Sequence, residues 1–270
     1  MKAQRFGLIV FGDELLSGKR QDAHAPKLIE LLAERGAELD WARYVRDERP
    51  AQASALRQAL ASGDTVFACG GIGATPDDHT RQAAAQAAGV PLQAHAEAQA
   101  LIWQRARETA ADQGLPAPAP DQPDMLRRLD MGVLPAGARL IPNPYNRIAG
   151  FSLGRVHFVP GFPVMAHPMM AWVLDTEYGL LPRPKAVRER SVVLKGAFEA
   201  QLSPLMEHIE ASFVGVKVFS LPSEDHPTWG KCIELGVKAG ADDAQRVAAF
   251  AALQAGVNQL GARICTELVR

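Results

Sequence analysis

A glycine-rich run that ends in two aspartates has the clearest potential for chemistry in this sequence. It reads Gly70-Gly-Ile-Gly-Ala-Thr-Pro-Asp-Asp78, between an apolar, strand-like segment over 64–69 and a helical pattern over 81–88. Glycines let a backbone approach a ligand closely, and the free N–H groups at the start of a helix bind phosphate. Carboxylates would repel a bare phosphate. The aspartates therefore suggest a divalent cation between the protein and the phosphate.

The same run also has a purely structural interpretation, in which an aspartate caps the helix and the glycines shape a tight turn. A second segment favours a site. Residues 6–11 form an apolar pattern typical of a buried strand, and Gly12-Asp-Glu-Leu-Leu-Ser-Gly18 follows it directly. The carboxyl ends of parallel strands share one edge of a sheet, where ligands bind. Two glycine and acidic loops at one edge indicate a ligand site more than two coincidental caps.

A third acidic residue, Asp47, follows the next predicted strand, although it could equally be an exposed turn residue. Oxygen ligands suit Mg²⁺ or another divalent cation, which would hold a phosphate or pyrophosphate for attack by water. Donors and a metal would then stabilise the charge that develops on phosphorus. We therefore predict metal ligation by Asp13, Glu14, Asp47 and Asp78, with Asp13, Asp47 and Asp78 catalytic, and phosphate binding by Gly12, Ser17, Gly70, Gly71, Gly73 and Thr75.

The elements that would position these residues alternate between strand and helix. Strand patterns over 6–11, 38–45 and 65–69 are separated by helical patterns over 25–35 and 51–62. This order implies right-handed crossovers and a mostly parallel sheet covered on both faces, a three-layer α/β domain over residues 1–180. Its second half is predicted to contain helices over 94–113, 125–131 and 162–178, a proline-bearing loop over 115–123, and strands over 139–141, 148–153 and 156–159.

A polar, proline-bearing stretch over 181–190 is predicted to be a linker to a second, smaller domain over 191–270. The patterns in that domain predict one sheet with helices on one face, an α+β arrangement. The expected strands cover 191–194, 214–221 and 231–239, and the expected helices cover 202–212 and 242–259.

Composition narrows the function classes. The 270 residues are 47% hydrophobic and 22% charged, with a net charge of −1, so we expect neither nucleic acid nor an acidic membrane as a partner. No apolar run approaches the ~20 residues of a membrane span, and we expect no signal peptide. Three widely spaced cysteines suggest reduced thiols and a cytoplasmic protein. The seven histidines lack metal-site spacing, which argues against zinc.

Four motifs in fixed order give a more specific indication. The segments 12–18 and 70–78, together with Asn143-Pro-Tyr-Asn-Arg-Ile-Ala-Gly150 and Val159-Pro-Gly-Phe-Pro163, resemble the MoaB/Mog-type molybdopterin-binding domain, in the branch found at the N-terminus of CinA. The resemblance covers most of residues 4–180. The chain departs from the family pattern in having Ala74 for a proline, His24 for an asparagine, and no Gly or Pro in 146–149.

This resemblance implies that the positions of Asp47 and Asp78 line a pterin-phosphate site and its metal. It also implies a KH-like C-terminal module, but the Gly-X-X-Gly clamp loop and a basic stripe are missing, so we expect no RNA binding. CinA's amidohydrolase domain has no counterpart here, and we expect no deamidase activity. Two functions stay open: a metal-dependent nucleotide pyrophosphatase acting on ADP-ribose or FAD, and a non-catalytic molybdopterin carrier linked to molybdenum cofactor biosynthesis. A homo-oligomer is expected.

Overall fold

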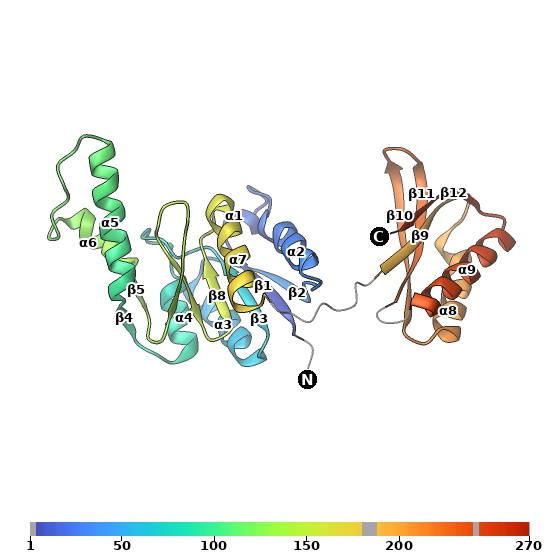
Figure 1. The fold of residues 1–270 in the computed structure, drawn as a ribbon, viewed down its shortest axis with the longest axis horizontal. Helices are drawn as coiled ribbons and strands as arrows, with labels where there is room; N and C mark the ends of the chain where they lie inside the picture. The colour runs from blue at the N-terminus through green and yellow to red at the C-terminus, as the bar shows by residue number, and fades with distance from the viewer. Residues whose placement is uncertain (1–3, 180–187, 240–242, 270) are drawn as a thin grey trace. The chain divides into compact units, whose positions relative to one another are not determined.

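The structure is a computed structural model that describes residues 4–179, 188–239 and 243–269, and the chain forms two compact units, Met1–Leu181 and Pro182–Arg270 (Figure 1). Residues 181–187 of the predicted linker lie outside the described residues. Residues 188–190, also assigned to that linker, instead begin strand β9 (Arg188–Lys195). The two units are described separately below.

The first unit is built on a six-stranded, mostly parallel sheet, as predicted, in the order β2-β1-β3-β8-β7-β6. Strands β2, β1, β3 and β8 run parallel, and β7 and β6 are antiparallel to their neighbours. Every residue of β1 and β3 is buried, which explains their continuous apolar sequences. The bounds are β1 (Phe6–Phe11), β2 (Trp41–Val45), β3 (Thr65–Cys69), β6 (Arg139–Ile141), β7 (Gly150–Leu153) and β8 (Val156–Val159).

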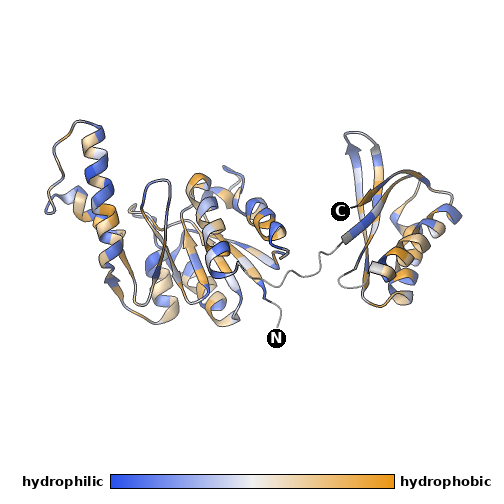
Figure 2. Ribbon diagram, in the orientation of Figure 1, coloured by the Kyte–Doolittle hydropathy of each residue, from blue (hydrophilic) through white to orange (hydrophobic). Residues whose placement is uncertain are grey.

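Helices cover both faces of this sheet, which gives the three layers. Alternation along β1 shows the two faces: Leu8 packs in one core cluster and Ile9 in the other. Helices α2 (His24–Glu34) and α7 (Pro163–Glu177) contribute to the Leu8 cluster, whereas α3 (Arg49–Ser62) and α4 (Thr80–Ala88) contribute to the Ile9 cluster. Figure 2 shows mixed hydrophilic and hydrophobic colouring on these helices.

An extension projects from one end of the first unit (Figure 1). It contains α5 (Ala96–Asp112) and α6 (Pro123–Asp130), with a small core of Ile102, Ala106 and Met125. Strands β4 (Leu92–Ala94) and β5 (Val133–Pro135) pair at its base, and neither was predicted. Ala94, assigned to the long helix from the sequence, belongs to β4 instead, because α5 begins only after its cap, His95.

The second unit is an antiparallel α+β domain with strand order β10-β11-β9-β12. Its chain order, βαββαβ, is that of the split βαβ or ferredoxin-like arrangement, in place of the KH-like module that was expected. Helices α8 (Glu199–Ser212) and α9 (Asp243–Gln259) share one core with the sheet, through residues such as Leu202, Phe250 and Leu235. The remaining strands are β10 (Val216–His226), β11 (Gly230–Ala239) and β12 (Arg263–Val269), of which β12 was not predicted.

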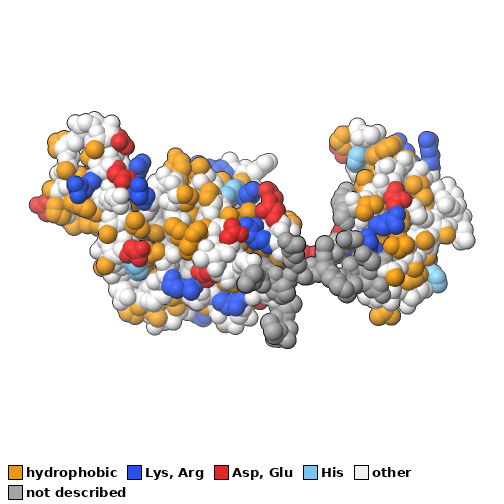
Figure 3. All heavy atoms as spheres, viewed as in Figure 1, with side chains coloured by type: hydrophobic (Ala, Val, Ile, Leu, Met, Phe, Trp, Pro, Cys, Tyr) orange, Lys and Arg blue, Asp and Glu red, His pale blue; other side chains and the backbone are white. Residues whose placement is uncertain are grey.

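Charged side chains of both signs share the surface. On the face drawn in Figure 3, Lys and Arg side chains are interspersed with Asp and Glu, without one large basic patch among the residues shown in colour. Within the described residues, no helix has both the length and the apolar character needed to cross a bilayer.

Candidate functional site

A cavity of about 420 Å³ lies at the carboxyl edge of the parallel strands. Because β1, β2, β3 and β8 run parallel, the loops that follow them meet at this edge. Those loops supply most of the lining, and the 143–148 segment supplies the rest of one wall. The lining residues are Phe11, Glu14, Arg20, Asp47, Gly70, Gly71, Ile72, Gly73, Ala74, Thr75, Asp77, Asp78, Met131, Asn143, Asn146, Ile148, Pro160, Gly161, Phe162 and Met165.

The glycine loop after β3 is tightly folded against the start of α4. Gly71 has a φ of +62°, and a Cβ atom there would lie 2.5 Å from Thr80 Oγ1. The Thr80 hydroxyl donates to Gly70 O over 2.9 Å, and the Thr80 N–H donates to Gly71 O over 3.0 Å. A Cβ atom on Gly73 would lie 2.6 Å from Asp78 Oδ2. A side chain at position 71 is therefore disfavoured by contact and by conformation, and one at position 73 by contact with Asp78.

The amides of this loop are free to bind a ligand. Within the described residues, the N–H groups of Gly71, Ile72 and Gly73 donate no hydrogen bond, whereas the Gly70 N–H donates to Val159 O over 3.0 Å. Consecutive free amides in a loop that leads into a helix form a concave binding site for anions. This part of the cavity can therefore hold phosphate oxygens.

Asp78 supports the loop from within. Its Oδ2 accepts a hydrogen bond from the Thr75 N–H over 2.9 Å and another from the Thr75 hydroxyl. These contacts close a local turn at the cavity wall. Asp78 thus borders the cavity, but one of its carboxylate oxygens is already occupied.

An acidic corner forms the opposite side of the cavity, defined here as Glu14, Asp47 and Asp77. Asp47 Oδ2 accepts the Asp13 N–H over 3.1 Å, and Asp47 Oδ1 accepts Gln52 Nε2 over 3.4 Å. Partial burial raises the pKa of Asp47, and repulsion from Glu14, Asp13 and Asp77 raises it further, while the bond from the Asp13 amide opposes both. The corner therefore carries negative charge that nearby donors compensate only in part.

The structure brings together seven of the ten residues predicted for the site. Glu14, Asp47, Gly70, Gly71, Gly73, Thr75 and Asp78 line the cavity, and Gly12, Asp13 and Ser17 do not. The Asp13 amide instead anchors Asp47, and the Gly12 N–H donates to Val45 O over 3.2 Å. Ser17 is exposed, and its hydroxyl donates to Glu14 O over 3.4 Å.

The predicted four-carboxylate metal site is not preassembled. Among residues 4–179, 188–239 and 243–269, no three His, Cys, Asp or Glu side chains converge in a way that could hold a metal ion. Mg²⁺, however, usually binds through one or two carboxylates together with substrate phosphates and water. The acidic corner fits that second mode, because its carboxylates line the cavity and their charge is only partly compensated by hydrogen bonds.

Two charged residues of the cavity were missed by sequence reasoning. Arg20 lies in the irregular segment after α1 (Asp13–Leu16), and its guanidinium has no hydrogen-bond partner in the described part of the chain. None of the sequence motifs includes Arg20. Asp77 belongs to the acidic corner, whereas the sequence argument selected its neighbour Asp78. Arg81, close to the loop in sequence, is buried at 3% exposure and supports the loop from beneath by donating to Gly73 O over 3.0 Å.

A buried histidine, His24, fixes the loop after β8, which forms another wall of the cavity. His24 Nε2 donates to Gly161 O over 3.1 Å, and burial lowers the pKa of His24, which keeps it neutral. Gly161 in turn lies against the glycine loop, since a Cβ atom on Gly161 would be 3.4 Å from Gly70 Cα. The neutral imidazole therefore fixes the loop after β8 beside the loop after β3.

Comparisons with known proteins show the family to which the first unit belongs. The family model described as a probable molybdopterin binding domain matches residues 7–178. A CinA-like protein of Citrifermentans bemidjiense is 34% identical over 208 residues, which are 75% of this chain and 47% of that protein. A CinA-like protein of Geotalea daltonii is 29% identical over 218 residues, covering 79% of this chain and 50% of that protein. The chain thus spans about half the length of these curated relatives.

A solved structure agrees with the first unit. The crystal structure of the protein CinA with unknown function from Thermoplasma acidophilum matches with a TM-score of 0.53 and 25% identity, over 64% of this chain and 98% of that one. The resemblance drawn from the four sequence motifs is confirmed. By the family model over residues 7–178, the chain belongs to the family of probable molybdopterin binding domains, and its relatives include the CinA-like proteins.

Proposed function

We propose that the first unit is a metal-dependent nucleotide pyrophosphatase, which hydrolyses a dinucleotide-type pyrophosphate such as ADP-ribose or FAD. One observation carries this proposal: the free amides of Gly71, Ile72 and Gly73 share a cavity with the acidic corner. Amides bind the phosphate, and carboxylates recruit the cation that a phosphate needs beside them. Free amides alone, or carboxylates alone, could belong to an ordinary turn, so the proposal depends on both lining one cavity.

The phosphate end of the cavity would hold the pyrophosphate. The loop amides donate to its oxygens, and Arg20 provides a guanidinium suited to paired contacts with phosphate. Because Arg20 has no other partner in the described residues, it loses no existing ion pair when a ligand binds. These donors would neutralise part of the phosphate charge, and the carboxylates of the acidic corner would remain free to hold the cation.

The acidic corner would act on the attacking water. Asp47, with Glu14 or Asp77, would hold a Mg²⁺ ion, which when bound would supply positive charge for the phosphates and a lowered pKa for a bound water. The Asp47 oxygen that is not bound to the metal could accept a proton from that water. The water oxygen forms a bond to phosphorus as the bridging P–O bond breaks. The products are two phosphate monoesters.

An apolar end extends the cavity beyond the phosphate. Met131, Ile148, Phe162 and Met165 line it, together with the amides of Asn143 and Asn146. Apolar walls with a few polar groups are typical of sites for flat organic groups such as a base or a pterin. The cavity could therefore hold one organic group attached to the phosphate.

A non-catalytic molybdopterin carrier is the second candidate function. The family description, probable molybdopterin binding domain, favours it, and so does the pairing of free amides with an apolar wall. The uncompensated acidic corner favours the enzyme, because a passive phosphate binder gains nothing from carboxylates.

The two functions can be separated with the full chain. ADP-ribose and FAD would be incubated with Mg²⁺, Mn²⁺ or Co²⁺, and released nucleoside monophosphate quantified by chromatography with and without EDTA. Binding of a pterin phosphate would be measured in parallel by calorimetry. Metal-dependent release supports the enzyme. No cleavage of any diphosphate, with micromolar binding of the pterin phosphate, about −8 kcal/mol of binding free energy, supports the carrier.

A further inference from the structure

A second groove, of about 780 Å³, adjoins the cavity on the side of the extension. Helix α5 forms one wall, the 142–147 loop forms another, and Pro168 and Trp172 of α7 complete it. We propose that this groove binds the second nucleoside of a dinucleotide whose pyrophosphate lies at the glycine loop. This inference rests on the proposed function and specifies its substrate: a molecule with an organic group on each side of the pyrophosphate, rather than a single pterin phosphate.

The groove and the cavity adjoin at the 143–147 loop. Asn143 and Asn146 line both, so groups bound in the two spaces would be neighbours. The cavity has room for one organic group beside the phosphates. A dinucleotide has two, and the adjoining groove is the space that the second would occupy.

The loop between the two spaces is held in one conformation. Asn143 Nδ2 donates to Asn146 Oδ1 over 2.8 Å and to Ile148 O over 3.0 Å, and Asn143 is only 4% exposed. The Tyr145 N–H donates to Asn143 Oδ1 over 3.0 Å. Arg147 adopts a φ of +64°, which is uncommon for a residue other than glycine. These hydrogen bonds hold the loop in the conformation in which Tyr145 and Arg147 line the groove.

The groove offers exposed aromatic rings. Tyr145 is 61% exposed and Trp172 is 36% exposed, on separate elements of the groove wall. Pro142, Pro144 and Pro168 add rigid apolar surface around them. Nucleobases stack on aromatic side chains whatever their sequence identity. Two rings on rigid supports therefore favour a flat aromatic ligand.

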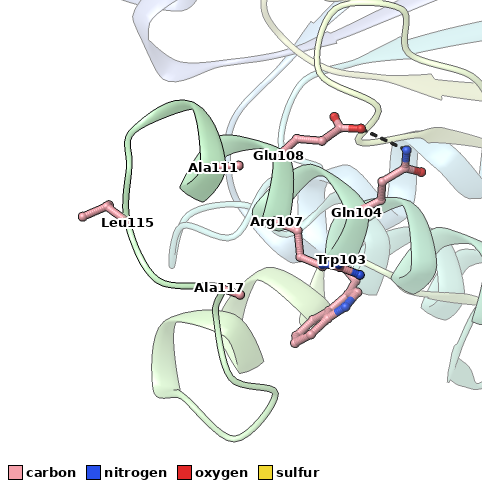
Figure 4. Close-up of a pocket in the computed structure, with 7 residues that line it drawn as sticks. All are labelled: Trp103, Gln104, Arg107, Glu108, Ala111, Leu115 and Ala117. Atoms are coloured by element: carbon pink, nitrogen blue, oxygen red, sulfur yellow. Dashed lines mark hydrogen bonds between the residues drawn. The ribbon is translucent and has the colours of Figure 1, made fainter.

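The charges in the groove favour a ligand that carries phosphate. Arg147 Nε lies 3.2 Å from Glu108 Oε2, and Gln104 Nε2 donates to Glu108 Oε1 over 2.9 Å (Figure 4). Arg105 also lines the groove, and its guanidinium has no ion pair in the described residues. One guanidinium is paired and one is free, so the groove has a net positive charge that suits a nucleotide.

Another hollow on α5 provides a matched comparison. It is lined by Trp103, Arg107 and Leu115 among others (Figure 4), and it too combines a tryptophan with an arginine. It shares no lining residue with the cavity, however, and it shares with the groove Glu108 but neither aromatic ring. A substitution of Trp103 should therefore leave dinucleotide binding unchanged, which makes Trp103→Ala a control for the loss of a tryptophan from this part of the protein.

Calorimetry on the full chain with Mg²⁺ tests the inference, with FAD, which has a flat ring system on each side of the pyrophosphate, as the dinucleotide and AMP as the single nucleotide. We expect Trp172→Ala and Arg105→Ala each to weaken FAD binding at least tenfold, and Trp172→Phe, which keeps a ring, to stay within threefold of the wild type. AMP binding should change less than FAD binding in every variant. Trp103→Ala should bind both ligands as the wild type does.

The outcomes separate this inference from the proposed function. Binding of FAD that depends on Trp172, without cleavage of FAD or ADP-ribose, contradicts the enzyme and retains the groove. Cleavage of FAD with unchanged affinity in Trp172→Ala and Arg105→Ala retains the enzyme and overturns the groove. Equal losses for FAD and AMP, or no FAD binding by the wild type, also overturn the groove.

Discussion

The backbone N–H of Asp13 donates a hydrogen bond to Asp47 Oδ2 over 3.1 Å. This bond joins the loop after β1 to the loop after β2 and orients a carboxylate toward the cavity. It does not neutralise that carboxylate, because Glu14, Asp13 and Asp77 all repel its charge. Asp47 is therefore held where its charge is unfavourable for the folded protein. Such an arrangement is expected where the charge serves a ligand or a reaction.

Asp47→Asn should separate activity from stability. The amide oxygen of asparagine can still accept the Asp13 N–H, while loss of the charge removes the repulsion within the acidic corner. We expect kcat/KM for ADP-ribose to fall at least 100-fold, since about 2.7 kcal/mol of transition-state stabilisation corresponds to that factor. The melting temperature should be unchanged or higher. Asp121→Asn, at an exposed position outside the cavity, is the control and should alter neither quantity.

The Asp78 carboxylate is expected to stabilise the turn around Thr75. Asp78→Ala removes the acceptor of the Thr75 N–H and hydroxyl, and we expect a loss of about 1 kcal/mol of unfolding free energy, as for a lost helix cap. Asp78→Asn keeps an acceptor oxygen and should lose less. Urea unfolding of the two variants measures the difference. Equal stability of Asp78→Ala and the wild type would show that the turn does not depend on this carboxylate.

Gly71→Ala should destabilise the glycine loop more than its backbone angle alone explains. An alanine at this φ of +62° costs about 1–2 kcal/mol. Its Cβ would also lie 2.5 Å from Thr80 Oγ1, which anchors Gly70 O. Gly89→Ala is the matched control, with a φ of +68° and no atom within 4 Å of the added Cβ. Urea unfolding should show the larger loss for Gly71→Ala, and equal losses would contradict the packing argument.

The stability of the first unit should fall between pH 6.5 and about 3 because of His157. Burial, with smaller effects from Arg139 and Arg155, lowers the pKa of His157 to about 3. In that pH range the unfolded chain binds a proton that the folded chain does not, so stability increases with pH and is lost as pH falls. The full effect is on the order of 4 kcal/mol.

His157→Phe should flatten this dependence. The ring can still pack against Phe67, but Ser152 Oγ and the Tyr178 hydroxyl lose their imidazole partners, which should lower stability at neutral pH. Urea titrations at several pH values measure both effects. His79→Gln, at a half-exposed position, controls for removal of one imidazole. An unchanged slope in His157→Phe would assign the acid sensitivity to other groups.

Local patterns were enough to predict the framework of the site. The apolar runs of β1 and β3 and the glycine loops after them place two loops at one edge of a parallel sheet, and that much follows from periodicity and turn chemistry. The pairing of β4 with β5 could not be predicted, because three-residue strands some forty positions apart carry no periodic signal. Strand β12 is longer, at seven residues, but its residues are only half-buried or exposed, so it shows no clear apolar alternation.

The roles of individual charged residues depended on the folded loop. Asp77 and Asp78 are adjacent and identical in type, and only the turn around Thr75 decides which carboxylate faces inward and which joins the acidic corner. Arg20 occupies an irregular segment with no motif, so its place in the cavity could be found only from the structure. Arg81, which is nearer to the glycine loop in sequence, is buried beneath it.

Hydrolysis of ADP-ribose by the full chain is the most direct test of the central claim. Phosphorus NMR during incubation with excess Mg²⁺ would follow the pyrophosphate signals and the appearance of two phosphate monoesters, AMP and ribose 5-phosphate, in equal amounts. We predict conversion by the wild type, arrest by EDTA, and at least 100-fold slower conversion by Asp47→Asn. Unchanged pyrophosphate signals with the wild type in the presence of Mg²⁺, Mn²⁺ and Co²⁺, or equal rates for the wild type and Asp47→Asn, would contradict the account.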